Sequence, residues 1–132
     1  MTYKLFVCHP WSHHDDYKTL VYSFEKTGLG FCDFSVSRDR PIEGTTTDAE
    51  LREAIKDRIR LVNCVFVLAG ECASRSKWMQ NELEIACELK KKIIAIRPHG
   101  NLRLSQPVQD NAFEIVNWSV ESLRKAIKRA AN

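Results

Sequence analysis

The chain lacks the features that would place it at a membrane or on a nucleic acid. Its 132 residues contain no run of 18 apolar residues, and the opening MTYKLFVCHPW has no basic segment leading into a long apolar one with a cleavage site. We therefore expect no membrane association and no export. The net charge of +3, with acids and bases interspersed, is too small for a dedicated nucleic-acid binder.

The cysteines lack the arrangement of a disulfide framework or a zinc site. Their number is odd, no C-x-x-C pair occurs, and most fall inside apolar runs, where a reduced cysteine behaves as a small hydrophobic residue. This usage favours a cytoplasmic protein. The five are Cys8, Cys32, Cys64, Cys72 and Cys87.

Common phosphate and metal motifs are missing as well. There is no G-x-G-x-x-G, no G-x-x-x-x-G-K-[ST], and the strand ends VCHP and VLAG lack the acids that a phosphoryl-receiver domain needs for magnesium. His13 and His14 are adjacent and diverge on a helix, so together with Cys8 and His9 they make a poor zinc site. We expect no metal and no cofactor.

What the chain does contain is an alternation of short apolar runs with amphipathic segments. Its length and 44% hydrophobic content fit one domain spanning residues 1–132. This pattern predicts an α/β fold, a single flavodoxin-like domain with a five-stranded parallel sheet and helices on both faces. The expected strands are 3–9, 31–36, 63–70, 93–96 and 113–116.

Several residues indicate where the helices begin and end. Gly28 is expected to stop the first helix, and Thr47 with Glu50 forms a capping box at the start of the second. The third is expected to begin after Ser74 or Ser76, and the lysines at 90–92 to complement the negative end of its dipole. A closing helix is expected over 119–131.

In parallel sheets of this kind, ligands bind outside the carboxyl ends of the strands. Three loops should meet there, HPWSHHDD, SRDRPIEGTTT and GECASRS, and Glu82 lies within two turns of the last one, with Trp78 one turn nearer to it. Glu82 is expected at the edge of a buried stripe. That stripe consists of Met79, Leu83 and Ala86, flanked by Ile85 and Leu89.

Each of these residues has an ordinary interpretation beside the functional one. Trp78 could simply pack on the sheet and Glu82 could be a solvated helix residue, because a lone W-x-x-x-E is a weak motif. If Glu82 is instead at the edge of the core, its carboxylate either has a hydrogen-bond or ion-pair partner or takes part in the function of the protein. Arg38 and Arg40 are either solvated loop charges or ligands for a pyrophosphate, which guanidinium groups can bind in a bidentate manner.

Taken together, four segments resemble the bacterial TIR-like domains, in particular a compact subgroup similar to the TIR proteins of Thoeris-type antiviral defence systems. They are KLFVCHPWSHHDDY, DFSV with SRDRPI, VNCVFVLAGECASRSKWMQNELEIA and KKKIIAIRPHG, and they span nearly the whole chain. The resemblance implies an enzyme that cleaves the nicotinamide–ribose bond of NAD. It further implies a cyclic or modified ADP-ribose messenger that activates a separate effector.

The resemblance also implies roles for particular residues. Glu82 would be catalytic, and the loop Ser37–Thr46 with its neighbouring helices would mediate self-association. Two alternatives remain open, a non-catalytic TIR-like interaction module and a nucleoside glycosyl transferase with Glu82 as nucleophile. The expected substrate-binding residues are Cys8, His9, Trp11, Arg38, Asp39, Ser76 and Trp78.

Overall fold

The computed structural model of the chain describes residues 2–8, 14–35, 47–68, 77–97, 110 and 112–131, and for 14–16, 48, 77–79 and 131 it describes the backbone only. The strands in these ranges are β1 (Thr2–Cys8), β2 (Gly30–Asp33), β3 (Cys64–Leu68), β4 (Ile93–Arg97) and β5 (Glu114–Asn117). The helices there are α1 (His14–Lys26), α2 (Asp48–Arg60), α3 (Lys77–Glu88) and α5 (Val120–Ala131).

The strands form one sheet, all parallel, in the order β2-β1-β3-β4-β5. Every residue of the central strand β3 is buried, because helices cover both faces of the sheet. The chain leaves β1 toward one edge and then returns across the sheet to β3, so the strand order reverses between β1 and β3. This topology confirms the predicted flavodoxin-like α/β fold.

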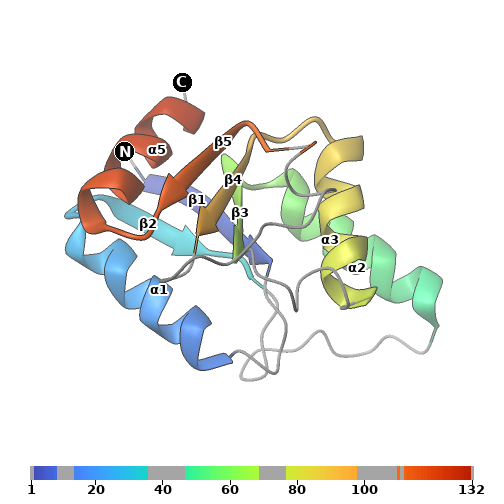
Figure 1. Ribbon diagram of the computed structural model, residues 1–132. Coiled ribbons are helices and arrows are strands. Elements are labelled where there is room, and N and C mark those ends of the chain that lie inside the picture. The colour runs from blue at the N-terminus through green and yellow to red at the C-terminus, as the bar shows by residue number, and fades with distance from the viewer. Residues whose placement is uncertain are drawn as a thin grey trace.

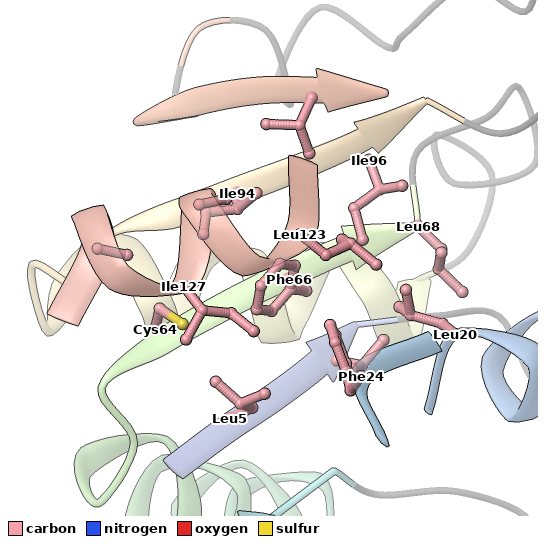
Figure 2. Close-up of a cluster of buried hydrophobic side chains, with 14 of the residues drawn as sticks. Leu5, Leu20, Phe24, Cys64, Phe66, Leu68, Ile94, Ile96, Leu123 and Ile127 are labelled. Carbon is pink, nitrogen blue, oxygen red and sulfur yellow. The ribbon is translucent and has the colours of Figure 1, made fainter. Parts of the chain in front are cut away.

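Successive residues of each strand serve opposite faces of the sheet, which divides the core in two. Helices α1 and α5 lie on one side of the sheet and α2 and α3 on the other (Figure 1). The first side is filled by large apolar side chains from four strands and both helices (Figure 2). Its labelled members are Leu5, Leu20, Phe24, Cys64, Phe66, Leu68, Ile94, Ile96, Leu123 and Ile127.

The second side of the core lies between the sheet and helices α2 and α3. Because side chains alternate along a strand, this side receives Cys8, the last residue of β1, whereas Val7 faces α1 and α5. Cys8 is paired in register with Val67 of β3. The other buried members are Phe6, Ile55, Ile59, Val62, Val65, Leu83, Ile85, Ala86, Ile93 and Ala95.

Two of the predicted helix boundaries are confirmed at atomic detail. Gly28 follows α1 with a φ of 75°, the left-handed conformation that glycine adopts without strain. Thr47 is the N-cap of α2, and its side chain accepts a hydrogen bond of 3.1 Å from the Glu50 amide. Residues close in the sequence therefore determine where α1 ends and where α2 begins.

The second strand is shorter than the expected 31–36. The Phe34 amide still donates to the Leu5 carbonyl at 2.8 Å, but the next β1 amide, Val7 N–H, donates to the Ser35 hydroxyl at 2.7 Å. A side-chain oxygen thus takes the place of a backbone carbonyl, and the regular ladder ends at Asp33.

The expected role of Lys91 is corrected. Helix α3 ends at Glu88 and has no basic residue in its last turn. The Lys91 ammonium instead donates to the carbonyls of Arg60 and Val62, each at 3.0 Å, and so satisfies acceptors at the C-terminal end of α2. Lys91 therefore joins two elements rather than stabilising its own helix.

Candidate functional site

The candidate site lies at the carboxyl edge of the sheet, where the strand order reverses. Cys8 ends β1 and Leu68 ends β3, and these two strands are neighbours. Helix α3 follows β3 in the chain and begins at Lys77, so Glu82 lies in its second turn, as the sequence predicts. In sheets of this topology the ligand crevice lies outside the carboxyl ends of such a strand pair.

Glu82 is buried completely, with 0% of its surface exposed. Along α3 the buried face contains Glu82, Ile85 and Ala86, with the half-buried Leu89 one turn further, which is the i, i+3, i+4, i+7 pattern of an apolar stripe. The expectation that Glu82 lies at the edge of this stripe is wrong. The carboxyl group occupies a position within the stripe, where the helix period calls for an apolar side chain.

The Glu82 carboxyl group has no hydrogen-bond partner among the described residues. Within the residues that the structure describes, neither Oε1 nor Oε2 accepts or donates a hydrogen bond. Burial raises the pKa of this carboxyl well above its usual value near 4.5. A carboxyl group in this state is rare, because removing a charge from water without a partner is costly.

Cys8 and Glu82 are brought together by the fold. Cys8 packs in the same cluster as Leu83 and Ala86, the helix neighbours of Glu82. Burial raises the pKa of the Cys8 thiol, and the nearby charges of Glu82 and then Cys87 raise it further. The thiol is therefore neutral and offers the carboxylate no positive charge.

A polar network on the side of the sheet that faces α1 was not anticipated from the sequence. Asp33, at the end of β2, accepts hydrogen bonds from the Tyr17 hydroxyl and from the Ser35 hydroxyl and amide. Ser35 in turn accepts from Val7, which links α1, β1 and the end of β2. An acid within the second expected strand, 31–36, was the available signal.

The side chains of the other predicted site residues lie outside the described part of the chain. His9, Trp11, Arg38, Asp39 and Ser76 lie outside the described residues, as does the whole of the loop Ser37–Thr46. For Trp78 the structure gives the backbone position in the first turn of α3 and not the side chain.

Two further findings concern the described ranges only. No group of three His, Cys, Asp or Glu side chains within them is arranged to hold a metal ion. Nor is any of the helices α1, α2, α3 and α5 long and apolar enough to cross a membrane.

Solved structures of known proteins share this fold. The TIR domain of the Toll-related receptor TRR-2 from Hydra magnipapillata matches with a TM-score of 0.66 and 18% identity, over 98% of this chain and 99% of that chain. The RPS4 and RRS1 TIR domain heterodimer gives a TM-score of 0.62 and 13% identity over 99% of each chain. A 2-deoxyribosyltransferase from Bacillus psychrosaccharolyticus gives 0.67 and 12%, over 92% and 90%.

At these identities the structural likeness shows the fold alone. A search of curated proteins gave no significant match. The sequence itself, however, matches a family described as Thoeris protein ThsB, TIR-like domain, over residues 6–103. The match includes both Cys8 and Glu82 and covers most of the chain. The chain therefore belongs to the Thoeris ThsB family of TIR-like domains.

Proposed function

We propose that this TIR-like domain cleaves the nicotinamide–ribose bond of NAD, with Glu82 as the catalytic carboxylate. The observation that carries the proposal is the buried carboxyl group of Glu82, which has no hydrogen-bond partner among the described residues and lies near the carboxyl ends of the strands. Membership of the Thoeris TIR-like family supports the same reaction class, since TIR domains of bacterial defence include enzymes of this kind.

The chemistry suits a single carboxylate. Breaking the bond leaves positive charge on the ribose, and nicotinamide departs as a neutral molecule that needs no proton. A carboxylate beside the ribose can accept a hydrogen bond from a ribose hydroxyl and stabilise the developing cation. The apolar neighbours of Glu82, among them Leu83 and Ala86, strengthen that electrostatic interaction because they exclude water.

Exclusion of water also bears on the product. When water is kept from the ribose cation, another nucleophile of the same substrate can attack it, which favours a cyclic or modified ADP-ribose over simple hydrolysis. We propose that this product is a cytoplasmic messenger that activates a separate effector. Self-association through the loop Ser37–Thr46 belongs to the same proposal. So does binding of the dinucleotide by Cys8, His9, Trp11, Arg38, Asp39, Ser76 and Trp78.

The experiment compares the wild-type protein with Glu82→Gln and Glu84→Gln. Both substitutions lie on α3 and remove one carboxylate, but the Glu84 side chain is 65% exposed. Concentrated protein is incubated with NAD, and products are resolved by chromatography and mass spectrometry. We expect Glu82→Gln to lower nicotinamide release by at least about 100-fold and Glu84→Gln to leave it unchanged.

Circular dichroism of each variant establishes that it is folded. A folded Glu82→Gln protein that still consumes NAD would remove Glu82 from the catalytic role. Activity on free nucleosides with none on NAD would instead assign a glycosyl transfer reaction. No turnover of either substrate, also in lysate of phage-infected cells, would favour the interaction module.

A further inference from the structure

The strand β5 forms one edge of the sheet and presents apolar side chains to solvent (Figure 1). Phe113, just before the strand, is 50% exposed, and Ile115 within it is 38% exposed. Val116, the next residue, is buried in the core beneath α1 and α5. Because side chains alternate along a strand, Ile115 lies on the opposite face of the sheet, where it remains open to water.

The outer edge of β5 is also open in its backbone. Within the described ranges β5 pairs with β4 alone, so every second residue directs its N–H and C=O groups away from the sheet. Natural edge strands are commonly protected by lysine or proline, and β5 contains neither. An edge of this kind can accept an extended segment as a further strand.

Positive side chains surround this edge. The Arg129 guanidinium of α5 binds both carboxylate oxygens of Glu114, the only acid of β5, with its Nε atom 3.0 Å from Oε2. Lys125 is exposed one helical turn before Arg129, on the same face of α5. The Lys92 ammonium lies 5.0 Å from the centroid of the Phe113 ring. The cations beside β5 therefore outnumber its acid.

We propose that the free edge of β5 binds an extended segment of a partner protein in which acidic and apolar residues alternate. The alternation follows from the two faces of the strand. On one face the segment packs against Ile115, and on the other its acids lie beside Arg129 and Lys125. A second copy of this chain fits less well, because two paired β5 edges would bring the cations of two α5 helices together.

This surface is distinct from the candidate site at Glu82. The site lies at the carboxyl ends of β1 and β3, whereas β4 separates β5 from β3. The inference therefore goes beyond the proposed reaction and does not depend on it.

The test uses a short peptide in which valine and aspartate alternate. In one control peptide lysine replaces aspartate, and in the other the same valines and aspartates are grouped in two blocks. Fluorescence anisotropy of each labelled peptide, titrated with the intact chain, gives the affinity. The wild type should bind the alternating acidic peptide at least about tenfold more tightly than either control. This binding should weaken as salt is added.

Amide hydrogen exchange followed by NMR locates the bound peptide. With saturating peptide, the amides of β5 that point away from β4 should exchange at least about tenfold more slowly, because they donate to the added strand. The amides of β2, at the other edge of the sheet, should be unchanged and serve as the internal comparison.

Two pairs of variants separate the apolar from the charged contribution. Ile115→Thr keeps a residue that favours strands but loses apolar contact, so it should weaken binding at least about fivefold. Leu61→Thr, at a site 57% exposed after α2, should have no effect. Lys125→Glu should also weaken binding at least about fivefold, whereas Lys18→Glu, the same change of charge on α1, should have a smaller effect. Circular dichroism establishes that each variant is folded.

Several results would overturn the inference. They are no saturable binding of the alternating acidic peptide, equal binding of the lysine peptide, protection of β2 in place of β5, and equal weakening by Leu61→Thr and Ile115→Thr. Protection of β5 that grows with protein concentration in the absence of peptide would identify a second copy as the occupant and would also overturn it. None of these measurements involves NAD, so this inference and the proposed reaction can fail separately.

Discussion

The residue that distinguishes this chain from an ordinary α/β domain is Glu82, a carboxyl group within an apolar helix stripe. In the unfolded chain it ionises near its usual pKa, whereas burial raises its pKa in the folded protein. Between those two values the folded state binds more protons than the unfolded state. The stability associated with Glu82 is therefore greatest below about pH 4.5 and falls as the pH rises toward the raised pKa.

We predict that Glu82→Gln removes this loss of stability. Relative to Glu82→Gln, the wild type should lose up to about 1.4 kcal/mol of unfolding free energy per pH unit within that window. Urea unfolding at several pH values between 5 and 8 measures the difference. Glu84→Gln is the control and should follow the wild type, since its side chain is largely exposed. Parallel profiles for the wild type and Glu82→Gln would show that Glu82 is not buried as described.

Sequence reasoning placed Glu82 on the correct helix and in the correct turn, but not at the correct depth. Helical spacing depends on α3 alone and could be read locally. The depth of burial depends on Cys8 and Ile55, which the chain brings to α3 from distant positions. Likewise the bond from Tyr17 to Asp33 joins residues of different elements that no local pattern connects, whereas the bonds from Ser35 to Asp33 span only two residues and are local.

At the scale of elements, α3 is followed by a left-handed backbone conformation that the sequence does not predict. Lys90 has a φ of 55°, and its amide bonds to the Cys87 carbonyl while the Lys91 amide bonds to the Ala86 carbonyl, each at 3.0 Å. This pair of bonds is the Schellman motif, in which the left-handed residue is usually glycine. A lysine there carries strain because of its Cβ atom.

We predict that Lys90→Gly stabilises the protein by up to about 1 kcal/mol, because glycine relieves that strain. Thermal unfolding measures the change as a higher Tm. Lys92→Gly is the matched control. Lys92 lies outside the left-handed region, so glycine there relieves no strain. The substitution adds chain entropy to the unfolded state and removes a contact with the Phe113 ring, and it should therefore lower the Tm. Destabilisation by Lys90→Gly would argue against the motif.

The elements that were predicted best from the sequence are those with a clear hydrophobic pattern or a capping residue. The buried run of β3 and the cap at Thr47 follow from neighbouring residues. The end of β2 was predicted too late, because a serine hydroxyl replaces a backbone acceptor for Val7. The role of Lys91 was wrong because its partners, the carbonyls of Arg60 and Val62, belong to a different part of the chain.

At the scale of the whole molecule, the sheet separates two halves of the core, and Glu82 lies on the side of only one of them. One half lies beneath α1 and α5 and the other beneath α2 and α3 (Figure 1). The first contains the Tyr17 hydroxyl, which donates to Asp33, and the second adjoins Glu82 of α3. Ile127 of α5 is 1% exposed and Ile85 of α3 is 0% exposed. Replacing either isoleucine with alanine therefore removes the same side-chain atoms, on opposite sides of one sheet.

We predict that Ile85→Ala and Ile127→Ala each lower the unfolding free energy by about 2–5 kcal/mol, from lost burial and an incompletely filled cavity. Only Ile85→Ala should also weaken the pH dependence of stability, because it opens space one helical turn from Glu82 and reduces the desolvation that raises its pKa. Urea unfolding at pH 5 and pH 8 separates the two effects. If Ile127→Ala changes the dependence of the unfolding free energy on pH by the same amount, the halves of the core are coupled through the sheet. A change in Ile85→Ala alone would mean that the environment of Glu82 is set by its own side of the molecule.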